Sequence, residues 1–228
     1  MAFETTPKFV TFDMNGTLIR FRISDAIREV LGDRLPAEIA DDFLQACKAY
    51  RIDECMGDYK PFQQIVAQSM ERAMRGFGLQ FRAADARAVY DHIPTWGPYP
   101  GVTEALRRLA EEVPLVIVTN SDDAHAARLV ENLQAPFEVV ITAEQMGVYK
   151  PRLRAFEYMF DKLGVTPEDI VHVSASPMYD LRSAAVMGIK NKVYVDRGFE
   201  ADEHWLGYER ITDIADLPVL FGLPRPTA

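Results

Sequence analysis

Short apolar runs alternate with amphipathic segments at the start of the chain and again over its second half. The apolar runs that predict strands are residues 8–12, 115–118, 138–141, 170–173 and 192–195. The amphipathic segments that predict helices are residues 102–109, 124–133, 152–163 and 179–187. Strands with few polar positions are typical of a sheet that is buried on both faces. Helices of this length between them predict right-handed βαβ units and a parallel sheet.

Residues 21–99 follow a different pattern, in which apolar positions recur at helical spacing and no strand-like run occurs. Helices are predicted to begin near residue 24 and to cover residues 37–50, 62–73 and 83–92. The turn-rich segment 94–100, Pro-Thr-Trp-Gly-Pro-Tyr-Pro, closes this block. The chain is therefore predicted to be an α/β protein with a doubly wound, Rossmann-like parallel-sheet core of residues 1–20 and 100–228. The helical block is predicted to form a small cap domain, inserted after the first strand.

The composition is that of an ordinary globular protein and narrows the range of partners. Apolar residues make up 48% of the chain, and no apolar run approaches the roughly 20 residues that span a bilayer. A net charge of −9 disfavours nucleic acid and anionic membranes as partners. The polar start of the chain leads us to expect no signal peptide and a cytoplasmic location. Cys47 and Cys55, in one predicted helix, are expected to be reduced thiols that pack and do not bridge.

Polar side chains follow four of the predicted strands at the points where the strands end. In a doubly wound sheet the carboxyl ends of the strands meet at one crevice, where ligands bind. The side chains expected there are Asp13, Thr17, Thr119, Asn120, Lys150, Ser174, Ser176 and Asp180. A carboxylate held at a strand end can act as a nucleophile and form a covalent ester. Asp13, Lys150 and Asp180, from separate segments, therefore predict a catalytic site.

Four motifs in this order resemble those of the haloacid dehalogenase superfamily. They are Asp-Met-Asn-Gly-Thr-Leu at 13–18, Val-Thr-Asn at 118–120, Val-Tyr-Lys-Pro at 148–151 and Val-Ser-Ala-Ser-Pro-Met-Tyr-Asp at 173–180. The third motif and the helical cap are most similar to the 2-haloacid dehalogenase branch. The resemblance extends over the whole chain and implies the same fold that the apolar pattern predicts.

The resemblance implies a hydrolase that needs neither a metal nor a cofactor. Asp13 would attack C2 of a small 2-haloalkanoic acid, displace halide and form an aspartyl ester, which water then hydrolyses. Lys150 would hold the Asp13 carboxylate and stabilise the developing charge. Asp180 would orient Lys150 or help to activate the water, and Ser176 is expected to take part in that hydrolytic step.

The same resemblance implies how the substrate is held. Thr17, Thr119 and Asn120 would hydrogen-bond the nucleophile, the substrate carboxylate or the halide. The backbone N–H groups of Met14 and Asn15 would bind the substrate carboxylate. The expected partner is a small anionic carboxylic acid. A homodimer is a further expectation, because related dehalogenases often dimerise.

The early cap helix departs from the dehalogenase pattern. An arginine that meets the substrate or the departing halide in that family aligns with Leu44 here. Arg51, Arg20 or Arg22 could replace it from nearby. The missing arginine also fits a related reaction, the hydrolytic ring opening of azetidine-2-carboxylate, in which the leaving group is an amine. This alternative uses the same nucleophile and stays open.

Other departures bear on the type of reaction. A tyrosine six residues after the motif lysine is Phe156 here, and the usual serine and asparagine of the fourth motif are Ala175 and Pro177. The magnesium-dependent phosphatases of the superfamily use two further acids, which align with Asn15 and Ala175. Asn15 is a poor general acid and Ala175 offers no oxygen ligand to a hard cation. A phosphatase is therefore disfavoured, and no required metal is predicted.

Each candidate also has a purely structural interpretation. Asp13 could form the turn, Asp180 and Ser176 could cap a helix, and Arg51 could form an ion pair on the cap surface. The four histidines lack ligand spacing, and His172 is predicted to be a core or sheet-face residue. A non-catalytic binding protein is the remaining alternative. Asp13→Asn should abolish turnover in an enzyme and leave binding intact in a binding protein.

Overall fold

A six-stranded parallel sheet forms the centre of the molecule. The computed structural model describes residue 3 and residues 6–226, and its sheet has the strand order β3-β2-β1-β4-β5-β6. The strands are β1 (Phe9–Phe12), β2 (Leu115–Thr119), β3 (Val139–Thr142), β4 (Ile170–Ser174), β5 (Lys192–Val195) and β6 (Glu209–Ile211). Every pairing is parallel. The predicted α/β fold with a doubly wound sheet is confirmed.

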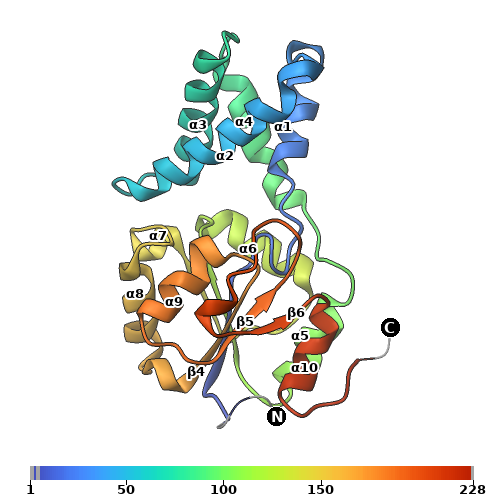
Figure 1. The fold of residues 1–228 in the computed structure, drawn as a ribbon, viewed down its shortest axis with the longest axis vertical. Coiled ribbons are helices and arrows are strands. Elements are labelled where there is room, and N and C mark those ends of the chain that lie inside the picture. Colours follow the sequence, from blue (N-terminus) through green and yellow to red (C-terminus); the bar gives the residue numbers. More distant parts are fainter. Residues whose placement is uncertain (1–2, 4–5, 227–228) are drawn as a thin grey trace.

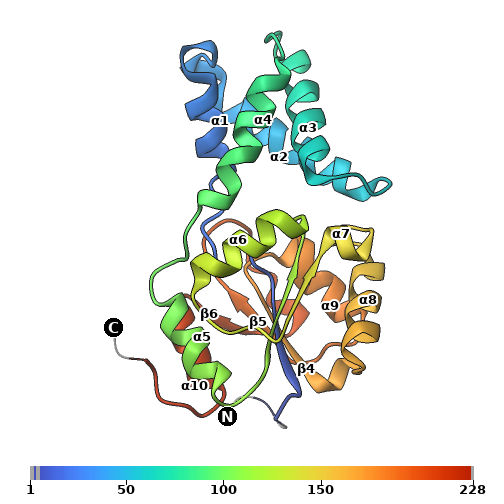
Figure 2. The same cartoon turned by 180° about the vertical axis from the view of Figure 1, so that it is seen from behind.

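Helices cover both faces of this sheet (Figures 1 and 2). The core helices are α5 (Val102–Ala110), α6 (Asp123–Leu133), α7 (Ala143–Met146), α8 (Leu153–Leu163), α9 (Arg182–Val186) and α10 (Leu217–Leu220). Helices α5 and α6 lie on one face, and α8 and α9 lie on the other. The apolar stripe of α5 is buried at Val102, Leu106 and Leu109. Each such side chain contributes about 1.5–3 kcal/mol when it is removed from water.

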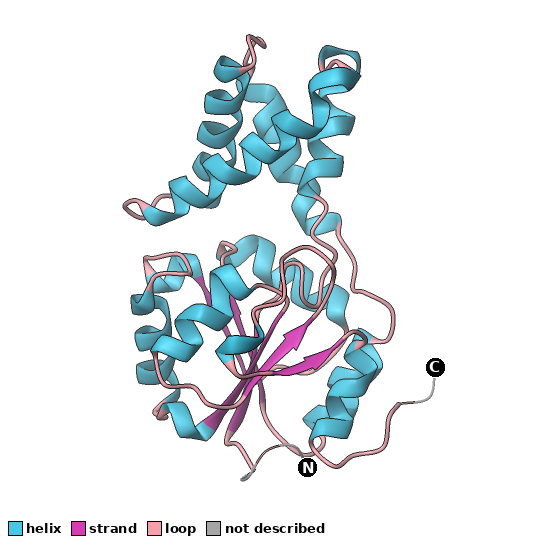
Figure 3. Ribbon diagram, viewed as in Figure 1, coloured by secondary structure: helices cyan, strands magenta, loops and turns pink. Residues whose placement is uncertain are grey.

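Four further helices form a separate layer beyond the carboxyl ends of the strands (Figure 3). They are α1 (Ile23–Leu31), α2 (Ala40–Met56), α3 (Phe62–Gly76) and α4 (Ala83–His92). Helix α2 packs on α3, and α4 packs on both α1 and α3. The residues between 21 and 99 contribute no strand to the sheet. This helical layer, called the cap below, therefore faces the edge of the sheet where the candidate side chains gather.

Aromatic side chains connect the cap to the core. The hydroxyl of Tyr149 donates to the Lys60 carbonyl at 2.7 Å, and its ring stacks on Tyr59 with the centroids 5.5 Å apart. A second contact comes from Tyr90 in α4, whose hydroxyl donates to the carboxylate of Asp122, which caps α6. These contacts join the cap to the core at the strand ends.

The segment after β4 differs from the prediction. The sequence predicts one helix over residues 179–187, but the structure has a turn of π-helix at Pro177–Leu181 before α9. The hydroxyl of Ser176 accepts the N–H of Tyr179 at 3.0 Å and so caps this turn. Turns of this kind are rare and are often found at functional sites. Here the wide turn carries Asp180, whose side chain is fully buried.

Two smaller expectations concern the cysteines and the membrane. Cys47 and Cys55 are both buried and unbridged, as predicted. Among the described residues, no helix is both long enough and apolar enough to cross a membrane.

Candidate active site

Asp13 follows β1 directly and lies in a tight turn that fixes its backbone. Its N–H donates to the Val173 carbonyl at 3.0 Å, and the Met14 carbonyl accepts the N–H of Leu18 at 2.9 Å. Gly16 has a φ of +94°, a conformation that side chains with a Cβ rarely adopt. The turn therefore needs glycine at position 16, three residues after the carboxylate.

Thr17 holds one carboxylate oxygen of Asp13. Its hydroxyl donates to Asp13 Oδ2 at 2.6 Å and accepts the N–H of Ala175 at 2.8 Å. Position 175 thus contributes to the nucleophile turn through its backbone N–H, which every residue except proline provides. The alanine at this position is compatible with an intact nucleophile.

Lys150 connects Asp13 to Asp180. Its Nζ lies 3.0 Å from Asp13 Oδ1 and 2.7 Å from Asp180 Oδ1, and it also donates to the Val118 carbonyl at 2.8 Å. These three bonds use all the hydrogens of the ammonium group. Only 1% of the lysine side chain is exposed, compared with 11% for Asp13. The structure thus brings together the acid, the lysine and the second acid that the sequence singles out, and Asp13 keeps access to solvent.

Burial and charge act in opposite directions on these three groups. Burial raises the pKa of Asp13; Lys150 opposes this effect, and the charge of Asp180 adds to it. Desolvation also disfavours the charged form of Asp180, but Lys150 and a hydrogen bond from His172 hold its pKa below the usual range. Lys150 is desolvated as well, yet the two carboxylates raise its pKa. At neutral pH Lys150 is a cation and Asp180 an anion, and Asp13 is the carboxylate more easily protonated by acid.

Asn120 forms two hydrogen bonds with the backbone of Lys150. Its Oδ1 accepts the lysine N–H at 2.8 Å, and its Nδ2 donates to the lysine carbonyl at 2.9 Å. The sequence predicts a contact between Asn120 and the nucleophile or the ligand. In the structure the amide instead joins the loop after β2 to the loop that carries the lysine.

Asn15 and Thr119 line the cavity and meet at Ser121. Asn15 Nδ2 donates to Ser121 Oγ at 2.8 Å, and Thr119 Oγ1 lies 3.3 Å from the same atom. The side chain of Met14 is buried in the hydrophobic core, so only its backbone can reach a ligand. Within the described residues, the N–H groups of Met14 and Asn15 have no protein acceptor.

His172 is fully buried in β4, as the sequence predicts, and it also belongs to the site. Its Nε2 lies 3.0 Å from Asp180 Oδ1, and its Nδ1 lies 2.8 Å from Thr11 Oγ1. Thr11 and His172 face each other in the register of β1 and β4. The contact between the two residues follows from the register of β1 and β4. The spacing of histidines along the sequence does not reveal this register.

Ser176 and Glu200 form a second polar group at the cavity. The hydroxyl of Ser176 donates to Glu200 Oε1 at 2.8 Å, and the N–H of Met178 donates to Glu200 Oε2 at 3.0 Å. Both Ser176 and Glu200 line the cavity. Glu200 comes from the loop after β5 and carries no motif, so the sequence did not mark it.

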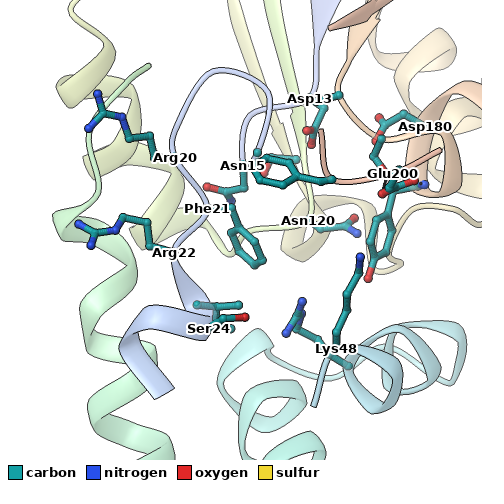
Figure 4. Close-up of a pocket in the computed structure, with 18 of the residues that line it drawn as sticks. Asp13, Asn15, Arg20, Phe21, Arg22, Ser24, Lys48, Asn120, Asp180 and Glu200 are labelled. Carbon is teal, nitrogen blue, oxygen red and sulfur yellow. Dashed lines mark hydrogen bonds between the residues drawn. The ribbon is translucent and has the colours of Figure 1, made fainter. Parts of the chain in front are cut away.

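A cavity of about 680 Å³ lies between the cap and these residues. Figure 4 shows Asp13 and Asp180 at its core end and Lys48 reaching toward them from α2. The side chains of Arg20 and Arg22 also line it but point away from Asp13. A volume of this size is typical of a pocket for a small molecule.

Arg51 is the most enclosed arginine of the cavity wall. It is 8% exposed, and its guanidinium lies 5.3 Å from the centre of the Phe21 ring. Among the described residues, no hydrogen bond or ion pair joins it to a carboxylate. Leu44 lies seven residues earlier on α2, which is close to two full turns. The interpretation of Arg51 as a surface ion-pair partner is therefore wrong, and the arginine shares its helix face with the position where the dehalogenase pattern expects one.

The residues present do not suit a divalent cation. In the described part of the chain, no group of three or more His, Cys, Asp or Glu side chains is placed to hold a metal ion. The ammonium of Lys150 already contacts both Asp13 and Asp180, while Asn15 is bonded to Ser121. The independence from metal stays a prediction that an assay must test.

Residues 7–188 match a family model described as haloacid dehalogenase-like hydrolase. This range includes β1, Lys150 and the turn that carries Asp180. The chain belongs to the haloacid dehalogenase-like hydrolase family. It is a hydrolase, and the resemblance of the four motifs is confirmed.

Known proteins of the family resemble the chain over most of its length. (S)-2-haloacid dehalogenase 1 of Pseudomonas sp. (strain CBS-3) is 25% identical over 170 residues, which cover 72% of this chain and 74% of that protein. Haloacetate dehalogenase H-2 of Moraxella sp. (strain B) is 26% identical over 200 residues, or 85% of this chain and 88% of that protein. The structure of L-2-haloacid dehalogenase from Xanthobacter autotrophicus with chloropropionic acid covalently bound has a TM-score of 0.77 at 20% identity, covering 95% and 99% of the two chains. This structural likeness supports the fold.

Proposed function

We propose that the protein is a metal-independent hydrolase that displaces halide from a small 2-haloalkanoic acid through an ester on Asp13. One observation carries the proposal. The Asp13 carboxylate is held by Lys150 at one oxygen and by Thr17 at the other, and it still opens onto the cavity. A carboxylate fixed in this way is a nucleophile whose position is set before the substrate arrives.

The first half of the reaction is a displacement at carbon. A carboxylate oxygen of Asp13 forms a bond to C2 of the substrate, and the C2–halogen bond breaks with its electron pair leaving on the halide. Because attack occurs opposite the leaving group, the configuration at C2 is inverted. Lys150 holds Asp13 in the required position, and the ordered N–H groups around the turn replace water as its solvent.

The second half is hydrolysis of the ester at the carbonyl carbon of Asp13. Water adds to that carbon and gives a proton to Asp180. The tetrahedral intermediate then expels the product oxygen, which takes the proton from Asp180 to become a 2-hydroxy acid. Asp13 is left as a carboxylic acid and loses its proton to solvent. One water is consumed, and one halide and one proton are released. Ser176 supports this step by capping the turn that carries Asp180.

The substrate carboxylate has two sets of donors. The N–H groups of Met14 and Asn15 lie next to the nucleophile and have no protein acceptor in the described structure. Arg51 supplies a buried guanidinium from the cap, and a cation in a partly dry pocket needs an anionic partner. Bound substrate would supply this partner either as its carboxylate or as the departing halide.

A second candidate reaction is the hydrolytic opening of azetidine-2-carboxylate by the same nucleophile. The position of Glu200 favours it, because this carboxyl group lines the cavity and binds Ser176. The ring nitrogen of the substrate is basic, so a carboxylate in the pocket can bind its protonated form. The same carboxyl group can give a proton to the amine as it leaves. A halide needs no such group.

A hydrolysis assay with EDTA present tests both reactions. Its panel is L- and D-2-chloropropionate, chloroacetate, fluoroacetate, L-azetidine-2-carboxylate and p-nitrophenyl phosphate, with the intact mass of the protein followed in parallel. Halide release with an adduct on Asp13 and inversion at C2 supports the first reaction, whereas ring opening alone supports the second. Phosphate release that depends on magnesium, with no activity on any acid, would overturn both.

A further inference from the structure

His172 lies between two polar side chains in the interior of the sheet. Its imidazole contacts Thr11 Oγ1 at 2.8 Å and Asp180 Oδ1 at 3.0 Å, and its ring packs edge-on against Phe156 with centroids 5.5 Å apart. The side chain is completely buried. A buried histidine with both nitrogens engaged has one orientation open to it.

The hydrogen-bond partners determine which nitrogen carries the proton. Asp180 is ionised and can only accept hydrogen bonds, so Nε2 of His172 donates to its Oδ1. In the neutral imidazole Nδ1 then accepts, and we assign the Thr11 hydroxyl, 2.8 Å away, as its donor, because the Val171 carbonyl, the other acceptor of that hydroxyl, lies farther away at 3.4 Å. The direction of donation runs from Thr11 to His172 to Asp180.

This chain of donors leaves the two oxygens of Asp180 with different roles. Oδ1 accepts from both Lys150 and His172. Oδ2 is buried and has no partner in the described part of the protein. Asp180 lines the cavity, so Oδ2 is the oxygen that can accept a hydrogen bond from water.

We propose that His172 is a positioning residue for the hydrolytic half of the reaction, which holds Asp180 so that Oδ2 receives the proton of the attacking water. This inference rests on the proposed function. Lys150 alone cannot fix the carboxylate plane, since its ammonium also bonds Asp13 and Val118 and would follow Asp13 when that carboxylate becomes an ester. The imidazole bond is independent of that change. His172 is not among the residues that line the cavity, so it acts through Asp180 and not on the water itself.

The test separates formation of the ester from its hydrolysis. Rapid-quench mixing of the enzyme with the haloacid that wild type turns over fastest, followed by intact mass, gives both rate constants. In His172→Leu, ester formation should stay near the wild-type rate, while hydrolysis should slow about 100-fold, the scale of a misplaced catalytic group. The aspartyl ester should then accumulate. His172→Gln, which keeps a donor at the place of Nε2, should restore most of the hydrolysis rate.

Two further variants distinguish the proposed role of His172 from a general loss of folding. Thr11→Val keeps the imidazole and removes only its orienting donor, so a slower hydrolysis step with unchanged ester formation is expected. Val171→Ala removes packing from the same strand without touching Asp180 and should slow neither step selectively. Hydrolysis at the wild-type rate in both His172→Leu and Thr11→Val, or equal slowing of both steps, would overturn the assignment. An absence of any ester on wild-type Asp13 would overturn the proposed function itself and this inference with it.

Discussion

The side-chain amide of Asn120 and the backbone of Lys150 are paired by two reciprocal hydrogen bonds, 2.8 and 2.9 Å long. This pair joins the end of β2 to the loop that carries the lysine. The position of Lys150 Nζ between Asp13 and Asp180 therefore depends on an amide that reaches neither carboxylate.

Asn120→Ala should weaken both stability and turnover. The substitution leaves the N–H and carbonyl of Lys150 without partners, which costs about 2–4 kcal/mol in the free energy of unfolding. Turnover should fall about 10- to 100-fold, because the lysine is no longer held in position. Urea unfolding and initial rates measure the two effects. Thr103→Val is the control, since it removes a hydrogen bond to the Leu133 carbonyl away from the site. If both variants lose the same stability and neither loses turnover, Asn120 has no role in placing the lysine.

In Lys150→Met the free energy of unfolding should increase as the pH falls, whereas acid usually destabilises a protein whose carboxylates are paired. Asp13 and Asp180 would remain buried without their cation, and the pKa of each carboxyl would rise above its unfolded value. The folded state then binds more protons than the unfolded state, so stability increases as pH falls from 7 to about 4. At neutral pH the loss should be about 3–5 kcal/mol, as expected when one partner of a buried ion pair is removed. Thermal unfolding across this range provides the measurement; a stability that falls with acid would show that the carboxylates have found other partners.

As the pH is lowered, the rate of ester formation should begin to fall at a pH above the ordinary pKa of aspartate. Burial first, and the charge of Asp180 in addition, raise the pKa of Asp13 above 3.8. Only the ionised carboxylate attacks carbon, so the acid limb of single-turnover ester formation reports this pKa. Asp180→Asn removes the neighbouring negative charge and leaves Lys150 to Asp13 alone. The limb should therefore move to lower pH, and the ester should persist because no base activates water. A limb that moves to higher pH would contradict the charge arrangement.

Arg51 should contribute to substrate binding more than to the chemical steps. Arg51→Met is expected to raise KM about 10- to 100-fold, the loss of one charge-assisted hydrogen-bonding partner. Arg51→Lys should recover part of the affinity, because the charge remains while the planar fork is lost. Arg22→Met is the matched control, since Arg22 lines the same cavity but pairs with Asp25 at 2.9 Å. Equal effects of Arg51→Met and Arg22→Met on KM would argue against a specific contact.

The sequence predicts most of the sheet because buried parallel strands are apolar throughout. Residues 192–195 coincide with β5, and residues 115–118 lack only the last residue of β2. It does not predict β6, because two of the three residues in that edge strand are exposed and form no apolar run. It also misses α7, since four residues are too few to show a helical period.

The site was predictable wherever a functional residue follows a strand. Asp13, Lys150 and Asp180 are found in this way, because the topology alone brings strand ends together. His172 is not, since its partner Thr11 is 161 residues away and only the register of two strands joins them. Glu200 lies in a loop after β5, and no repeating pattern specifies the course of such a loop.

The source of the oxygen in the product tests the central claim most directly. A single turnover with excess enzyme in H2¹⁸O should leave the label in the carboxylate of Asp13, since water attacks the carbonyl carbon of the ester. The first product should carry the unlabelled oxygen that Asp13 supplied. Peptide mass spectrometry locates the label on the protein, and the mass of the hydroxy acid shows whether the product contains ¹⁸O. Label in the first product and none on Asp13 would mean that water attacks the substrate directly, and Asp13 would not be the nucleophile.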